Sequence, residues 1–167
     1  DLQERSQIPL LIAQDMEWGA GMRLSETTSF PRAMALGASR RPELARAMGR
    51  AVAREARSVG VHMNYAPVAD VNNNPDNPVI NVRSFGERPD LVGEMASAYV
   101  LGMKEGGLLS AVKHFPGHGD TDVDSHSGLP ILSLNRARLD SRELKPFLES
   151  IEAGAEAVMV GHIALPA

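Results

Sequence analysis

Short apolar runs alternate along the chain with longer segments of helical periodicity. Each run is short enough to be a buried strand, and the runs lie at Ile8–Ala13, Val61–Val68, Leu108–Phe115 and Glu156–Ile163. The segments with apolar residues at helical spacing lie at Pro42–Gly60, Asp90–Gly107 and Ser141–Ala155. Asp90 is expected to cap the second of these helices at its N-terminus. The pattern therefore predicts strand, helix, strand, helix, strand, helix, strand.

Alternating strands and helices are typical of parallel βαβ units. The links into each later strand are short and contain glycine, whereas the links that leave the strands are long and polar: Gln14–Arg41, Ala69–Pro89 and Pro116–Ser133. Loops at the carboxyl ends of parallel strands carry the sites of α/β proteins. No glycine-rich phosphate-binding motif follows a strand. A (β/α)₈ barrel is favoured over a doubly wound sheet.

The length of 167 residues supplies about half of such a barrel, which typically takes ~250 residues. Residues 1–167 are therefore expected to be a single segment of the barrel, with the remainder of the barrel absent. The open edges of a half barrel would permit self-association. The first residue is not Met, which suggests a processed or excised piece.

Composition narrows the class of partners. Apolar residues make up 43% of the chain and charged residues 23%, as in globular proteins. A net charge of −4 and an aromatic content of 4% do not indicate a nucleic-acid surface. No apolar run reaches the roughly 18 residues of a membrane span, and the N-terminus has no basic segment typical of a signal peptide. The chain has no cysteine, which is compatible with oxidising and reducing compartments alike.

The stretch KHFPGHGDTDVDSH, residues 113–126, contains the closest grouping of candidate catalytic and metal-binding side chains. Its aspartates match the start of a calcium loop, but Ser125 and Ile131 stand where that loop needs Gly and Glu. Its histidines match neither helical HExxH spacing nor a zinc finger. Asp124 and His126 fit acid/base chemistry, since a turn can bring the carboxylate to the ring and leave the other ring nitrogen to exchange protons. From the residues alone, two solvated loop side chains remain the alternative.

The same stretch resembles family 3 glycoside hydrolases. Further similarity lies in IPLLIAQDMEWGAGMRL, NYAPVADV, NVRSFGE and VMVGHIALP, in the same order from about Ile8 to Pro166. The Asp-Ser-His that follows Lys-His-Phe-Pro-Gly-His-Gly resembles the bacterial β-N-acetylhexosaminidase branch of the family. The resemblance implies the N-terminal barrel domain of a retaining exo-β-N-acetylglucosaminidase that acts on cell-wall-derived glycans. A β-glucosidase or β-xylosidase of the same family, and a non-catalytic sugar-binding fragment, are the alternatives.

The resemblance also implies roles for particular residues. His126 would be the general acid/base and Asp124 its orienting partner. The residues expected to bind sugar hydroxyls are Asp15, Arg83, Lys113 and His114. His162, at the end of the fourth strand, would either approach the site or be structural. No metal or cofactor is implied, and the partner is a carbohydrate rather than a nucleic acid or a membrane.

Other residues are expected to be structural. Glu17 is predicted to support its loop, Trp18 to pack in it, His62 to be structural and His118 to shape the loop around it. Family 3 enzymes use an aspartate nucleophile on a later strand, in a motif that no residue up to Pro166 supplies. The segment is therefore expected to carry the acid/base and much of the sugar site without the nucleophile, and to be inactive alone.

Overall fold

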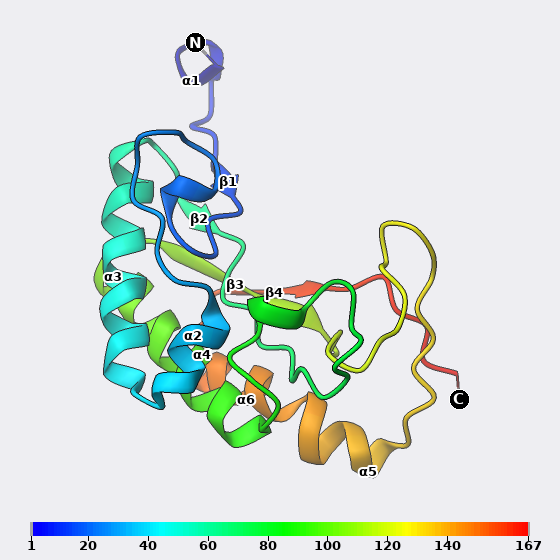
Figure 1. Cartoon of the computed structure of the whole chain (residues 1–167). Coiled ribbons are helices and arrows are strands. Elements are labelled where there is room, and N and C mark those ends of the chain that lie inside the picture. Colours follow the sequence, from blue (N-terminus) through cyan, green and yellow to red (C-terminus); the bar gives the residue numbers. More distant parts are fainter. Residues whose placement is uncertain (1, 167) are drawn as a thin grey trace.

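Four parallel strands form the centre of the computed structural model, which describes residues 2–166 (Figure 1). The strands are β1 (Ala13–Gln14), β2 (Met63–Asn64), β3 (Leu109–Phe115) and β4 (Ala157–Val160). They lie side by side in chain order, each parallel to the next. All four therefore present their carboxyl ends at one edge of the sheet.

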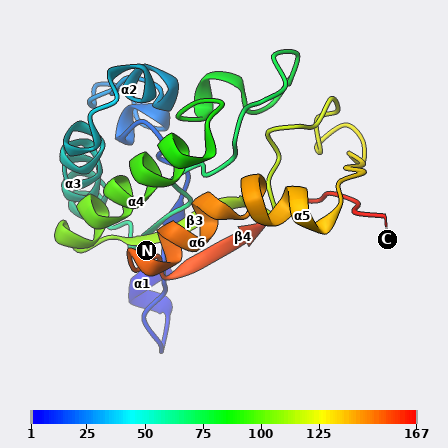
Figure 2. The same ribbon diagram turned by 90° about the horizontal axis from the view of Figure 1, so that it is seen from below.

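Three long helices connect the strands: α3 (Pro42–Ser58), α4 (Pro89–Glu105) and α6 (Lys145–Glu152). Helix α4 packs between α3 and α6, and the three cover one side of the sheet (Figure 2). The shorter elements are α1 (Leu2–Arg5), η1 (Ala20–Met22), α2 (Ala33–Ser39), η2 (Asn81–Arg83), α5 (Arg136–Arg138) and the π-helical turn η3 (Leu139–Glu143). This order of strands and helices is the βαβ arrangement that the sequence predicts.

Helices α3 and α4 approach each other closely because each contributes a glycine to their contact. A Cβ on Gly49 would lie 2.4 Å from the carbonyl oxygen of Tyr99, and one on Gly102 would lie 2.0 Å from that of Arg46. Any larger side chain would force the helices apart. The apolar residues beside this contact, including Val52 and Met103, are fully buried in the core against the sheet.

The predicted fold class is confirmed: the chain is an α/β segment with a four-stranded parallel sheet, consistent with part of a (β/α)₈ barrel. Some boundaries were wrong. The first strand is Ala13–Gln14 rather than Ile8–Ala13, and the second is only Met63–Asn64. The polar link after β1 contains α2, which the sequence pattern did not predict.

Two helix starts also differ from prediction. Asp90 is not the N-cap of α4: Pro89 begins the helix, because its fixed φ suits the first helical position, and Arg88 is the N-cap. Asp90 instead contacts Lys145 of α6. The third predicted helix begins at Lys145 rather than Ser141, after the π-helical turn.

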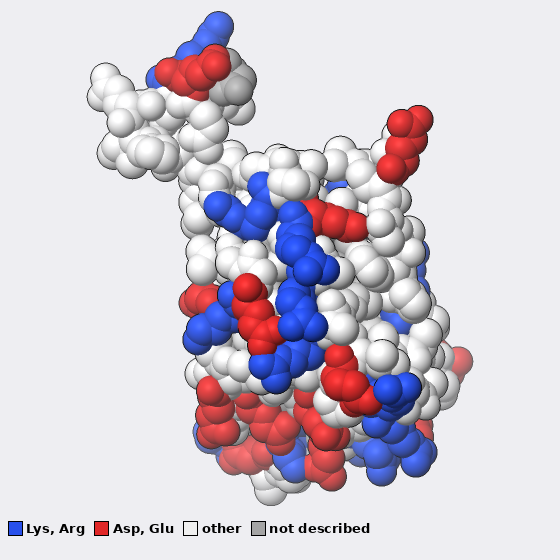
Figure 3. All heavy atoms as spheres, turned by 90° about the vertical axis from the view of Figure 1, so that its left-hand side faces the viewer, with Lys and Arg blue, Asp and Glu red and all other residues white. Residues whose placement is uncertain are grey.

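The outer face of α3 is charged and solvated. Figure 3 shows this side of the protein, with a band of basic side chains beside acidic ones. Arg46 and Arg50 of α3 both pair with Glu105 at the end of α4. Exposed pairs of this kind contribute little stability, and the polar chemistry of interest lies at the strand ends instead.

Candidate active site

A cleft with a volume of about 430 Å³ opens at the carboxyl ends of the strands. This edge of a parallel sheet is where α/β proteins place their sites, because the loops that follow the strands converge there. The predicted site residues that line the cleft are Asp15, Arg83, Lys113, His114, His126 and His162. Asp124 does not line the cleft but contacts it through His126.

Lys113 forms the centre of an ion-pair cluster in the cleft. Its ammonium lies 2.6 Å from Oδ1 of Asp15 and 2.8 Å from Oε1 of Glu17, and its side chain is only 3% exposed. A charge buried this deeply requires opposite charges beside it, since water no longer solvates it. Asp15 follows β1 and Lys113 lies in β3, so the order of strands brings them together.

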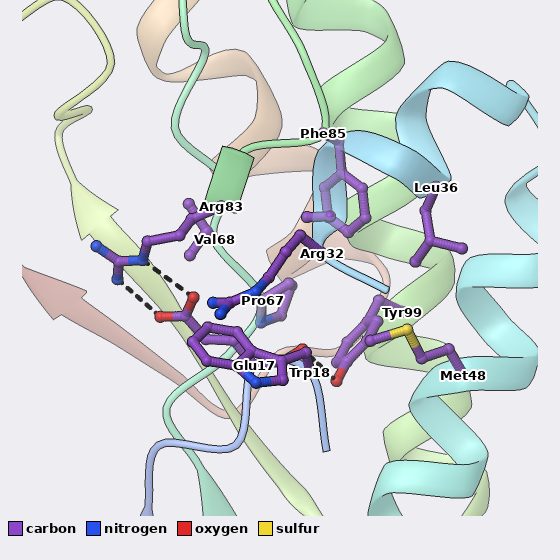
Figure 4. A pocket seen from close by; sticks show the side chains of 11 residues that line it. Glu17, Trp18, Arg32, Leu36, Met48, Pro67, Val68, Arg83, Phe85 and Tyr99 are labelled. Carbon is purple, nitrogen blue, oxygen red and sulfur yellow. Dashed lines mark hydrogen bonds and ion pairs between the residues drawn. The ribbon is translucent and has the colours of Figure 1, made fainter. Parts of the chain in front are cut away.

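Glu17 joins Lys113 to Arg83. The guanidinium of Arg83 donates two hydrogen bonds to the Glu17 carboxylate, at 2.7 and 3.0 Å (Figure 4). Burial alone would raise the pKa of Glu17, but Arg83 and Lys113 outweigh it and lower the pKa to about 2. Glu17 was predicted only to support its loop, yet it also lines the cleft and orients two cations of the predicted sugar site. The feature of the sequence that could have indicated this role was a second acidic residue two positions after Asp15.

Arg23 is a second residue that the sequence interpretation missed. Its guanidinium lies 3.2 Å from Oδ2 of Asp15 and donates to the Asp15 carbonyl oxygen at 3.0 Å. Asp15 is therefore held between Arg23 and Lys113. No pattern in the sequence marked Arg23, because the contact depends on how the loop after β1 turns back on itself.

Asp70 is the third missed residue, and it is fully buried beneath His114. Its Oδ2 lies 2.7 Å from Nδ1 of His114, and its Oδ1 accepts from the backbone N–H of His118 at 2.6 Å. Burial alone would raise the pKa of Asp70, but His114 and the backbone N–H groups outweigh it and lower the pKa. The position of Asp70 in the sequence could have indicated this role. Asp70 follows the run of residues after β2, just as Lys113 and His114 lie near the end of β3.

His118 also lines the cleft, and its contacts hold the loop around it. The ring is buried and packs edge-on against His114, with the ring centroids 6.0 Å apart. Its Nδ1 lies 2.5 Å from Oγ1 of Thr121, and its carbonyl oxygen accepts from Asn77 at 2.8 Å. Burial lowers the pKa of His118, which favours the neutral ring. These contacts anchor the start of the loop that carries Asp124.

Asp124 and His126 form a hydrogen-bonded pair on that loop. Oδ1 of Asp124 lies 2.8 Å from Nδ1 of His126 and also accepts from the His126 backbone N–H at 2.9 Å. The backbone N–H and the ring of His126 hold the pKa of Asp124 below its usual value. Because an ionised carboxylate only accepts, Nδ1 carries the proton and Nε2 is free to exchange one. The imidazole side chain is 86% exposed at the rim of the cleft.

The whole chain matches the model of the glycosyl hydrolase family 3 N-terminal domain, over residues 1–167. The chain belongs to this family. It is 44% identical over 171 residues to beta-hexosaminidase A of Pseudoalteromonas piscicida, covering 99% of this chain and 29% of that protein. It is 35% identical over 166 residues to a beta-N-acetylglucosaminidase/beta-glucosidase of Cellulomonas fimi, again covering 99% and 29%.

A solved structure of the same family is also close. The family 3 beta-N-acetylglucosaminidase from Paenibacillus sp. str. FPU-7 superposes with a TM-score of 0.92 at 47% identity, covering 96% of this chain and 31% of that one. The chain thus spans about a third of the length of these relatives. The predicted resemblance to family 3 is confirmed.

Three further residues considered in the sequence analysis are His162, His62 and Trp18. They lie beside the cleft or away from it. His162 lines the cleft just after β4. His62 accepts a hydrogen bond from the backbone N–H of Ile12 at 3.1 Å, a structural contact. The Arg32 guanidinium lies 3.2 Å above the Trp18 ring. Trp18 also borders a separate cavity of about 10 Å³, which has room for one water molecule and none for a sugar ring (Figure 4).

The described residues 2–166 of this family 3 chain contain no group of three or more His, Cys, Asp or Glu placed to hold a metal ion. Asp120, the first aspartate of the rejected calcium pattern, contacts Asn73 and Arg138 instead. Within the same residues, no helix is long and apolar enough to cross a membrane.

Proposed function

We propose that the full-length protein is a retaining exo-β-N-acetylglucosaminidase that acts on glycans derived from the bacterial cell wall. The observation that carries the proposal is the Asp124–His126 hydrogen bond at the rim of a cleft whose floor holds a cluster of charged side chains. The first group has the chemistry to move a proton. The second has the chemistry to hold a sugar ring.

His126 acts as the general acid and then as the general base. Its Nε2 first gives a proton to the glycosidic oxygen as the bond to the leaving group breaks, and it later removes a proton from the water that attacks the glycosyl-enzyme. Asp124 holds the ring in the required tautomer and stabilises the imidazolium. An imidazole replaces the carboxylic acid that most glycosidases use in this role.

The charged floor of the cleft binds the hydroxyl groups of the non-reducing sugar. Each hydroxyl donates one hydrogen bond and accepts others, so carboxylates and cationic donors together can satisfy it. Asp15 supplies the acceptor, and Arg83 and Lys113 supply donors at positions that Glu17 stabilises. His114 completes this set from the end of β3. The mechanism uses no metal or cofactor.

The nucleophile is proposed to lie outside residues 1–167. The two carboxylates that line the cleft, Asp15 and Glu17, are both paired with Lys113, at 2.6 and 2.8 Å. A carboxylate neutralised in this way is a weak nucleophile. Asp70 is buried beneath His114 and does not line the cleft. The charged groups of the cleft therefore support binding rather than attack.

N-acetylglucosamine is the preferred sugar because the relatives from Pseudoalteromonas piscicida and Paenibacillus carry hexosaminidase or N-acetylglucosaminidase names. A β-glucosidase or β-xylosidase of the same family is the second candidate. The Cellulomonas fimi relative favours it, since its name includes both an N-acetylglucosaminidase and a β-glucosidase.

Parallel kinetics with an aryl β-N-acetylglucosaminide and an aryl β-glucoside separate the two candidates. We expect the full-length protein to show the higher kcat/KM with the N-acetylglucosaminide. Faster turnover of the glucoside would assign the second candidate, and turnover of neither would leave a sugar-binding role. In that last case, protection of the protein against thermal unfolding by N-acetylglucosamine would indicate a sugar-binding protein. The absence of protection would show that the cleft does not bind this sugar.

A further inference from the structure

Asp70 combines complete burial with contacts to two histidines of the cleft. Its Oδ2 lies 2.7 Å from Nδ1 of His114, while its Oδ1 accepts from the backbone N–H groups of His118 at 2.6 Å and His114 at 3.2 Å. Neither the sequence interpretation nor the proposed mechanism uses this carboxylate. Burying a charge is costly, so an aspartate at this position calls for a physical reason.

The two neighbours of the His114 ring define its tautomer. An ionised Asp70 carboxylate can only accept a hydrogen bond, so Nδ1 of His114 must carry a proton. On the opposite side of the ring, Nη2 of Arg83 lies 3.4 Å from Nε2 of His114. A guanidinium can only donate, so Nε2 must present its single lone pair on this side, and at 3.4 Å the contact is long enough for a sugar hydroxyl to replace it. Both contacts therefore select the neutral ring with its proton on Nδ1.

We propose that Asp70 is a positioning residue that holds His114 with its proton on Nδ1, so that Nε2 presents a hydrogen-bond acceptor to a sugar hydroxyl in the cleft. The inference rests on the proposed function for the identity of the ligand. Within the cleft, the acceptor on His114 complements the donors on Arg83 and Lys113. A hydroxyl that accepts from one of these cations can then donate its own proton to His114.

The backbone N–H groups that bind Asp70 make Asp70→Asn a specific test of this proposal. The N–H of His118 donates to Oδ1 at 2.6 Å, whereas the N–H of His114 lies 3.2 Å from Oδ1 and 3.3 Å from Oδ2. The short contact with His118 therefore places the oxygen of an asparagine at the Oδ1 position. Its amide nitrogen then takes the position of Oδ2 and donates to Nδ1 of His114. The proton of the ring must move to Nε2, where it faces the donors of Arg83. In serine proteases the same change of carboxylate to amide keeps the geometry and imposes the wrong tautomer.

Kinetics on the full-length protein measure the consequence. We expect Asp70→Asn to lower kcat/KM for an aryl N-acetylglucosaminide about 10- to 100-fold, since the sugar hydroxyl then meets a donor instead of an acceptor. In a His114→Ala background the same substitution should change kcat/KM less than about twofold. Asp76→Asn, at an exposed aspartate, is the matched control. An undiminished loss in the His114→Ala background would overturn the positioning role.

A direct measurement of the tautomer needs no activity, and its deciding spectrum is that of the wild-type protein. Nitrogen NMR spectra of the full-length protein labelled with ¹⁵N-histidine, with His114 assigned by its absence in His114→Gln, report which ring nitrogen carries the proton. We expect protonation at Nδ1 in the wild type and at Nε2 in Asp70→Asn. Protonation at Nε2 in the wild type would refute the inference. If no aryl glycoside were turned over, the proposed function would fail while this spectrum still decided the role of Asp70.

Discussion

Asp124 and His126, two residues apart on one loop, are joined by 2.8 Å between Oδ1 and Nδ1, while the His126 ring faces solvent at the rim of the cleft. The carboxylate contacts one nitrogen of the ring and leaves the other free. This is the arrangement that orients a histidine for proton transfer. Loss of such a pair is expected to change how the rate of hydrolysis depends on the leaving group.

Replacement of His126 by Ala should slow the hydrolysis of substrates with poor leaving groups most. General acid catalysis contributes about 10²- to 10⁴-fold to such a step, and a good leaving group needs little of it. The measurement is the slope of log kcat/KM against the leaving-group pKa for a series of aryl N-acetylglucosaminides. Asp122→Asn, an exposed aspartate on the same loop, serves as the control. Equal losses across the series would argue against the role of His126.

Glu17→Gln should remove an acid-dependent part of the stability. The pKa of Glu17 falls from 4.5 to about 2 on folding, which contributes about 3 kcal/mol to the free energy of unfolding above pH 5. A lowered pKa stabilises the folded state above the unfolded value, and this contribution is lost as the pH falls from 4.5 toward 2. The variant also leaves the buried charges of Lys113 and Arg83 short of a partner.

Chemical denaturation of the full-length protein at several pH values measures this effect. Glu17→Gln should be less stable at pH 7, and its stability should fall less steeply than that of the wild type below pH 4.5. Glu43→Gln is the matched control, since Glu43 pairs with Arg41 at the surface. Identical slopes for the wild type and Glu17→Gln would show that the ion pairs around Glu17 do not stabilise the fold.

A chelator should leave the activity of the full-length protein unchanged. The proposed chemistry uses an imidazole and carboxylates, and no metal-binding group of three or more acidic or histidine residues occurs among residues 2–166. The measurement is kcat/KM before and after dialysis against EDTA. A loss of activity that returns with added zinc would replace the acid/base mechanism with a metal-dependent one.

The 167-residue segment alone should neither hydrolyse an aryl glycoside nor remain a monomer. Among the described residues, β1 pairs only with β2 and β4 only with β3, so both outer strands have unpaired edges. Apolar side chains near these edges, Leu11 and Val160 among them, are exposed. Unpaired edges promote association between chains. Light scattering should detect oligomers; a monodisperse monomer, or an active segment, would contradict the prediction.

The order of strands and helices could be predicted because periodicity is a local property of the sequence. The run Leu108–Val112, for example, is apolar on both faces except at Ser110, as expected for a strand covered on both sides. The extent of the first two strands could not be predicted in this way. Residues 8–12 are apolar enough for a strand, but whether they pair depends on the neighbour to which the sheet brings them. Helix α2 was missed because its segment has no strong apolar periodicity.

The sequence by itself determined the family and the alternation of strands and helices. It also predicted the Asp124–His126 pair, whose members lie close enough in the chain for one turn to join them. Only the tertiary structure decided that Lys113 meets Asp15 and that Asp70 lies beneath His114, contacts that span 98 and 44 residues of sequence. Such contacts depend on the register of parallel strands, which no single segment encodes. The ion pairs of the cleft and the carboxylate beneath it could therefore be recognised only once the sheet had placed the strand ends side by side.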